Sequence, residues 1–188
     1  MEMLKKIRLN VGRSILGNKV SRMRRTRFRG NFGKAKTIGI VWDASKQEEF
    51  TVLSKFYQMM HERKIAVKIL GYFPGKNLPD LYTAIRYLTC FKEQDVNFFY
   101  RPVSVEATSF INTRFDILIA INFNKLFPIH YITSLSVAGL KVGMFENGSD
   151  NPPFDLMIDL HNNTDIETYL TQVVYYLEMI DPGTNKRI

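Results

Sequence analysis

The chain has 188 residues, 45% of them hydrophobic and 23% charged, which is an ordinary composition for one globular domain. Its single cysteine, Cys90, excludes an internal disulfide and a CxxC motif, and its three histidines lie too far apart in sequence to form a metal-binding pair on one helix. The net charge of +8 is concentrated at one end, because residues 1–36 contain twelve basic residues and one acid, whereas the rest contains 14 basic and 17 acidic residues.

The N-terminal segment begins with a predicted amphipathic helix over residues 3–24. Leu4, Ile7, Val11 and Ile15 recur at helical spacing, and basic residues occupy other faces. Each of two interior glycines costs about 1 kcal/mol relative to alanine, so the helix is expected to be marginal on its own.

From residue 22 onward, arginines alternate with glycines and phenylalanines, which is typical of an extended and flexible strap. The arginine guanidinium donates two parallel hydrogen bonds to phosphate, and aromatic rings stack on exposed bases. The segment is therefore predicted to bind RNA, for example ribosomal or other structured RNA. The predicted RNA-binding residues are Lys5, Lys6, Arg8, Arg13, Lys19, Arg22, Arg24, Arg25, Arg27, Phe28, Arg29, Lys34 and Lys36.

The sequence leaves three other roles for this segment open. On an anionic membrane, Leu4, Ile7, Val11 and Ile15 would enter the lipid interface while the lysines meet the headgroups. A solvated basic tail would serve solubility alone. An arginine-rich, acid-poor N-terminus is also a feature of organellar transit peptides, although hydroxyl residues are few here.

Targeting signals are otherwise lacking in the sequence. No segment comes near the roughly 18 apolar residues that a membrane span requires. The basic N-terminus is not followed by the apolar core of a secretion signal. With one cysteine and no disulfide, these features predict a cytoplasmic protein.

Residues 37–188 are predicted to form the folded body behind a basic arm at 1–36. Thr37–Asp43 is apolar and β-branched, as expected for a buried central strand. A capping box from Ser45 to Glu48 predicts the start of a helix, and the next strand is predicted at 65–72. The first unit is therefore βαβ, with a right-handed crossover.

The second half continues the alternation less regularly. Leu81, Ile85, Leu88 and Phe91 predict a short helix that would carry the cysteine on its apolar face, and a strand fragment follows at 98–103. The remaining predicted elements are strands at 115–121, 140–145 and 154–160, a helix near 125–138, and a closing helix that starts at a capping box from Thr164 to Glu167.

Apolar strands that alternate with amphipathic helices predict one doubly wound, mostly parallel sheet of the Rossmann-like α/β type. In such sheets, ligands bind beyond the carboxyl ends of the strands. The polar residues expected there, which define a possible ligand crevice, are Asp43, Ser45, Asn122, Asn124 and Asn147.

The crevice carries little recognisable chemistry. The sequence has no dinucleotide fingerprint, phosphate loop or nucleophile elbow, so no cofactor and no metal are predicted. Asp43 and Ser45 are predicted to cap the following helix. Binding is therefore favoured over catalysis, and a small enzyme or ligand sensor built around Asp43 is the alternative. The acidic body offers a surface to a protein partner, and the sequence does not specify an oligomeric state.

The strand patterns also resemble those of a known family. They are Lys36-Thr37-Ile38-Gly39-Ile40 with Asp43, Phe110-Ile111-Asn112, Phe115-Asp116-Ile117-Leu118-Ile119, Leu140-Lys141-Val142-Gly143 and Asp155-Leu156-Met157-Ile158. Over residues 36–180 they resemble an uncharacterised family of small Bacteroidota proteins with a basic N-terminus, a domain of unknown function. The resemblance implies the same α/β fold and supplies no activity.

Overall fold

The computed structural model describes residues 2–28, 32–145, 152–161 and 164–180 and shows one six-stranded parallel sheet. The strands are β1 (Thr37–Asp43), β2 (Ala66–Phe73), β3 (Leu88–Lys92), β4 (Ile117–Ile121), β5 (Leu140–Met144) and β6 (Leu156–Ile158). They lie in the order β3-β2-β1-β4-β5-β6. This order reverses between β1 and β4, as in the doubly wound Rossmann arrangement, so the predicted fold class is confirmed.

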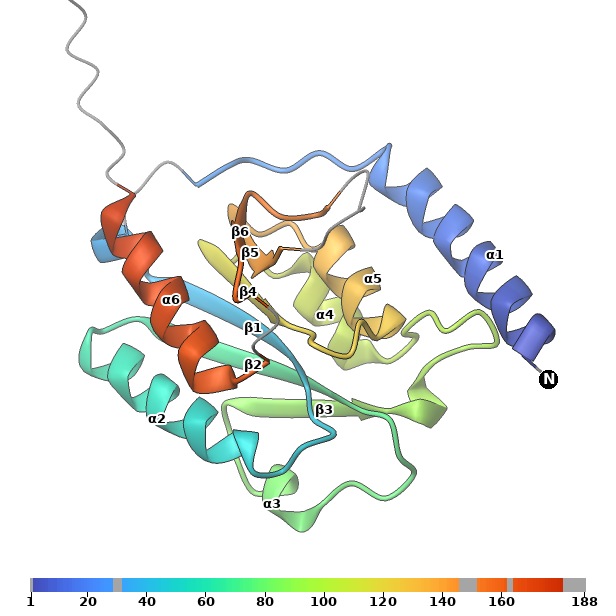
Figure 1. The fold of residues 1–188 in the computed structure, drawn as a ribbon, viewed down its shortest axis with the longest axis horizontal. Coiled ribbons are helices and arrows are strands. Elements are labelled where there is room, and N and C mark those ends of the chain that lie inside the picture. Colours follow the sequence, from blue (N-terminus) through green and yellow to red (C-terminus); the bar gives the residue numbers. More distant parts are fainter. Residues whose placement is uncertain (1, 29–31, 146–151, 162–163, 181–188) are drawn as a thin grey trace, which may run out of the picture.

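Helices cover both faces of the sheet (Figure 1). The helices are α1 (Glu2–Val20), α2 (Glu49–Glu62), α3 (Asp80–Thr83), α4 (Val105–Asn112), α5 (Phe127–Leu135) and α6 (Ile166–Met179), with 3-10 turns at Phe32–Lys34 and Glu93–Asp95. One core joins the sheet to α2 and α6, and a second joins it to α4 and α5. α1 lies outside this layer, beside α5. No described helix is both long and apolar enough to cross a membrane.

The region 80–114 differs from the sequence prediction. Leu88 and Phe91 do not share a helix face, because Leu88–Lys92 is the edge strand β3. Leu88 packs into the α2 and α6 core, whereas Phe91 packs into the α4 and α5 core. Only Leu88 and Phe91 of this strand are buried, three residues apart and on opposite faces, so the pattern imitates helical spacing. The predicted strand at 98–103 is replaced by an isolated bridge between Val96 and Pro102.

Both predicted capping boxes are displaced. α2 begins at Glu49, after a turn, and has no side-chain cap, so Ser45 does not cap it. α6 begins one residue later than the box from Thr164 predicts, because Asp165 is the N-cap and accepts a hydrogen bond from the Thr168 amide. At α6 the neighbouring Asp165 made the helix start ambiguous in the sequence, whereas α2 has no side-chain cap at all.

Candidate functional site

α1 packs against α5 through a face that the sequence pattern does not predict. Leu16 is buried with Phe127 and Tyr131 of α5. Gly12 permits this approach, because a Cβ atom there would lie 2.5 Å from the carbonyl oxygen of Phe99 and 3.0 Å from the Phe127 ring. The predicted apolar row of α1 is therefore not its docked face.

Arg8 fixes the N-terminal half of α1 to the loop that follows β3. Its guanidinium carbon lies 4.2 Å from the centre of the Phe98 ring and 4.5 Å from that of Tyr100. Its Nε donates a hydrogen bond of 2.6 Å to the Phe98 carbonyl oxygen. Cation–π contact with both rings holds this partly buried side chain, which the sequence predicts to bind RNA.

The strap that follows α1 is extended, but it is anchored rather than free. The Arg25 guanidinium donates to the carbonyl oxygens of Ala138 and Gly139, at 3.1 and 3.2 Å, and to the carboxylate of Asp155. The amide of Phe28 donates to the Gly139 oxygen at 3.0 Å. A Cβ atom on Gly139 would lie 2.6 Å from that of Phe28, so glycine is needed for this contact.

Asp155 is the anion that holds the strap. Burial alone would raise the pKa of Asp155, but the hydrogen bonds from Arg25 and the Lys141 amide, with the nearby charges of Arg25 and Arg27, hold it below its ordinary value. The Lys141 side chain is buried beside this cluster and donates to the Ser134 carbonyl oxygen at 2.9 Å. Burial, and then the charge of Arg25, lower the pKa of Lys141 to about 8.

The strap crosses the amino-terminal edge of the sheet (Figure 1). Its partners Gly139 and Asp155 directly precede β5 and β6, and the amides of Lys36 and Thr37 donate to Asp116, which precedes β4. Phe32 is buried in the main core, and Phe28 is partly buried and packs against it. The ring of Phe28, which the sequence predicts to stack on a base, therefore keeps only part of its surface exposed.

Most of the other predicted RNA-binding residues face solvent. Of the basic residues described in the first 36 positions, only Arg8 and Arg25 are partly buried. The exposed ones are Lys5, Lys6, Arg13, Lys19, Arg22, Arg24, Arg27, Lys34 and Lys36. Arg29 lies outside the described residues. Three exposed arginines, Arg22, Arg24 and Arg27, thus flank the anchor at Arg25.

The predicted crevice forms in part, at the carboxyl ends of β1 and β4. Asp43 is buried, and its two carboxylate oxygens accept hydrogen bonds from the Asn124 side chain, at 2.6 Å, and from the Ser45 amide, at 3.1 Å. Asn122 closes the loop after β4 through two hydrogen bonds with Leu126. Asn147 lies outside the described residues. Asp43 therefore joins β1 to the loop after β4 at the reversal of strand order, instead of capping α2.

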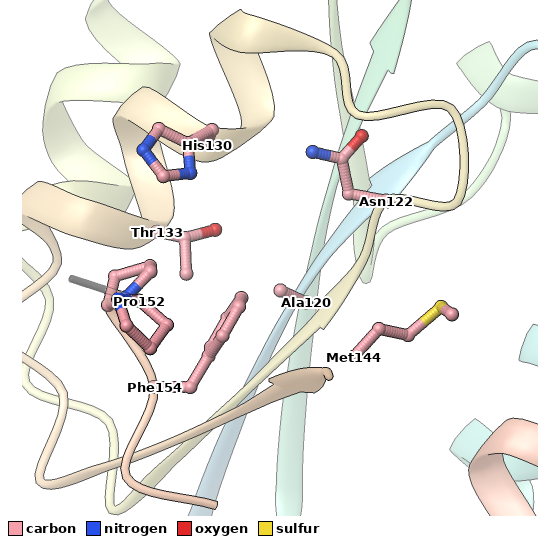
Figure 2. A pocket seen from close by; sticks show the side chains of 8 residues that line it. Ala120, Asn122, His130, Thr133, Met144, Pro152 and Phe154 are labelled. Atoms are coloured by element: carbon pink, nitrogen blue, oxygen red, sulfur yellow. The ribbon is translucent and has the colours of Figure 1, made fainter. Parts of the chain in front are cut away.

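A hollow lies next to Asn122, between α5 and the ends of β4 and β5 (Figure 2). His130, Thr133 and Phe154 line it, and its volume of about 20 Å³ is close to that of one water molecule. Thr133 donates to the Ile129 carbonyl oxygen within its own helix. Among the described residues, no three His, Cys, Asp or Glu side chains gather as a metal site. This hollow is therefore too small to hold a substrate.

These contacts lead to a first prediction, on Asp43. Asp43→Asn should lower the free energy of unfolding by about 1 kcal/mol, because each hydrogen bond that it weakens has roughly that net value. Thermal unfolding would measure the loss, and complementation of a deletion strain would measure function. A folded variant that fails to complement would overturn this reading and place Asp43 in an active site.

Cys90 lies on β3 and not on a helix, and burial raises the pKa of its thiol to about 12. A thiol in this state is protonated at neutral pH and is a poor nucleophile. The cysteine is thus a packing residue of the edge strand.

Comparison with known proteins places most of the chain in one family. The sequence model of a family described as "Family of unknown function (DUF6913)" matches residues 8–180. The match begins within α1, so it includes the strap and extends across the predicted boundary at residue 36. A search of curated proteins found no match.

Proposed function

We propose that this chain, which belongs to the DUF6913 family of unknown function, is a non-catalytic cytoplasmic protein that binds RNA through its basic N-terminal segment. The observation that carries the proposal is the row of exposed arginines, Arg22, Arg24 and Arg27, beside the anchored Arg25. Asp155 pairs with Arg25, whereas the neighbouring arginines of the strap face solvent. Arg27 makes only a longer contact, with 3.6 Å between its guanidinium and the Asp155 carboxylate.

An anchored strap suits phosphate binding better than a free tail. A flexible segment loses conformational entropy when it becomes ordered on binding RNA. The contacts of Arg25 and Phe28 already order the strap in the folded protein, so less entropy is lost when RNA binds. The exposed guanidinium groups are then presented along one edge of the sheet. Lys34, Lys36 and Arg114 are exposed near the same edge, where β1 and β4 begin.

The rest of the surface limits where RNA binds. Residues 37–188 carry a net charge of −3, so RNA is attracted to the basic N-terminal segment and not to the body. Phosphate contacts position a nucleic acid without reading its sequence. With both phenylalanines of the strap packed inward, the proposed interaction is with the backbone of structured RNA and is weakly sequence-dependent.

A second prediction tests this function. Replacing Arg22, Arg24 and Arg27 together by alanine should weaken RNA binding and lower the log–log salt slope by about 2, since each phosphate contact contributes about 0.7 on single strands. Fluorescence anisotropy with a structured RNA, across a salt series, would measure both quantities. The fold should be unaffected, because these side chains are exposed.

The matched control removes three exposed cations of the body, through Lys55→Ala, Lys76→Ala and Arg86→Ala. It changes the net charge equally and should leave RNA affinity within about twofold. Equal losses in both triple variants would show a nonspecific charge effect, and no binding by the wild-type protein at low salt would refute the proposed function.

A further inference from the structure

The outward side of α1 carries a row of exposed apolar side chains. Met3 is 77% exposed, Leu4 54%, Ile7 52% and Val11 37%. Their spacing places them on one side of the helix. We call these four residues the α1 ridge. Leu16 and Gly12 face the opposite way, into the contact with α5, so docking of the helix leaves the ridge uncovered.

Basic residues flank the ridge. Lys6 and Arg13 are exposed and seven residues apart, so they lie on one flank of the helix. Glu2 is the one acid in α1. Apolar side chains bordered by lysine and arginine are the pattern by which a helix lies in a membrane interface and binds anionic headgroups.

We propose that the α1 ridge inserts into the surface of an anionic membrane, with Lys6 and Arg13 on the lipid headgroups. This inference goes beyond RNA binding and rests on the apolar side chains of α1, whereas the strap arginines lie at the amino edge of the sheet. Phe98 stacks against Arg8 and is exposed, so its ring adds apolar surface next to α1.

The shape of the ridge favours a membrane over a protein. α1 lies at the periphery of the molecule, along the flank of α5 (Figure 1). A stable protein interface covers about 800 Å² on each partner, far more than four side chains on one helix provide. A lipid interface needs no matching groove and takes up a protruding apolar row directly. RNA is also disfavoured here, because aliphatic side chains offer no flat surface for base stacking.

Docking on the body prepares the helix for this role. With Gly12 and Gly17 in its interior, α1 would be a weak helix as a free peptide. The contacts of Arg8 and Leu16 with the body hold it helical before it meets lipid. The ridge is therefore presented without a folding step.

A third prediction tests the ridge with the full-length protein and sedimented vesicles of phosphatidylcholine, with and without phosphatidylglycerol. Wild-type protein should bind the anionic vesicles, and a fraction should stay bound at high salt, because apolar insertion is not screened. Ile7→Ser with Val11→Ser should weaken binding by about tenfold per side chain, from the loss of apolar burial. The melting temperature should stay unchanged, since both residues are exposed.

The control pair is Leu81→Ser with Val103→Ser, which removes two exposed apolar side chains from other parts of the surface and should leave vesicle binding intact. Replacement of Arg22, Arg24 and Arg27 by alanine should reduce RNA binding and spare the salt-resistant vesicle binding. The proposal is wrong if wild-type protein ignores anionic vesicles, if both serine pairs weaken binding equally, or if the ridge variant loses RNA binding instead.

Discussion

A chain that begins at Thr37 is expected to be much less stable than the full-length protein. Phe32 is only 4% exposed and belongs to the main core, and Ala35 is buried beside it. Loss of a buried phenylalanine side chain alone costs about 3–5 kcal/mol, which is a large part of the stability of an ordinary domain. The truncation also removes Phe28 from the core and Arg25 from Asp155.

A ladder of truncations would locate the boundary. A chain from residue 24 keeps Arg25, Phe28 and Phe32 and loses the docked α1 together with residues 21–23, so it should still unfold cooperatively. A chain from residue 37 should unfold at much lower urea concentration, or fail to fold. Equal stability of the two shortened chains would show that residues 37–188 fold as an independent domain, as the sequence alone predicts.

The sheet was predictable because its central strands are buried on both faces. Every residue of β4 is buried, as are all but the first of β1, and such strands produce continuous apolar runs that are easily recognised. The alternation with helices then predicts a doubly wound sheet. β3 was missed because an edge strand with different partners on its two faces has no such run.

The docking of the N-terminal segment on the body could not be predicted from the residues of that segment alone. Arg25 is 130 residues from its partner Asp155 and 114 residues from its partner Gly139. An arginine-rich stretch therefore predicts solvent exposure unless its partners are known. Phe28 and Phe32 were the available hint, because two phenylalanines are costly to leave in water and are more often buried.

At the predicted crevice, the structure brings Asp43 together with Ser45 and Asn124. Asp43 and Asn124 come together because parallel strands β1 and β4 are neighbours and end at the same edge. Their mutual hydrogen bond depends on the loop geometry after β4, where Lys125 adopts a positive φ of 52°. No residue pattern encodes that conformation in a form that sequence reasoning recognises.

Asp155→Asn is expected to destabilise the protein by about 3–5 kcal/mol, the usual cost of breaking a largely buried ion pair. The Asp155 side chain is 9% exposed and that of Arg25 is 16% exposed, so solvent screens them little. The substitution also leaves two cations, Arg25 and the buried Lys141, without the anion between them. Urea unfolding at neutral pH would measure the loss.

The stabilisation that Asp155 provides should depend on pH. The pKa of Asp155 is lower in the folded protein than its ordinary value of 3.8, so the stabilisation is complete above that value and is lost as pH falls through the folded pKa. Wild-type and Asp155→Asn proteins should therefore converge in stability in strong acid. A difference that persists unchanged there would show that the carboxylate charge is not the cause.

A double-mutant cycle with Lys141→Met separates charge from packing. If the cost of Asp155→Asn arises from unpaired cations, removing the buried Lys141 ammonium should reduce it by more than the error of additivity, about 0.5 kcal/mol. Strict additivity would assign the loss to the Arg25 and Lys141 amide hydrogen bonds alone.

In either case the strap should loosen in Asp155→Asn, and protease cleavage near the strap arginines should accelerate, because Asp155 is the carboxylate that holds Arg25.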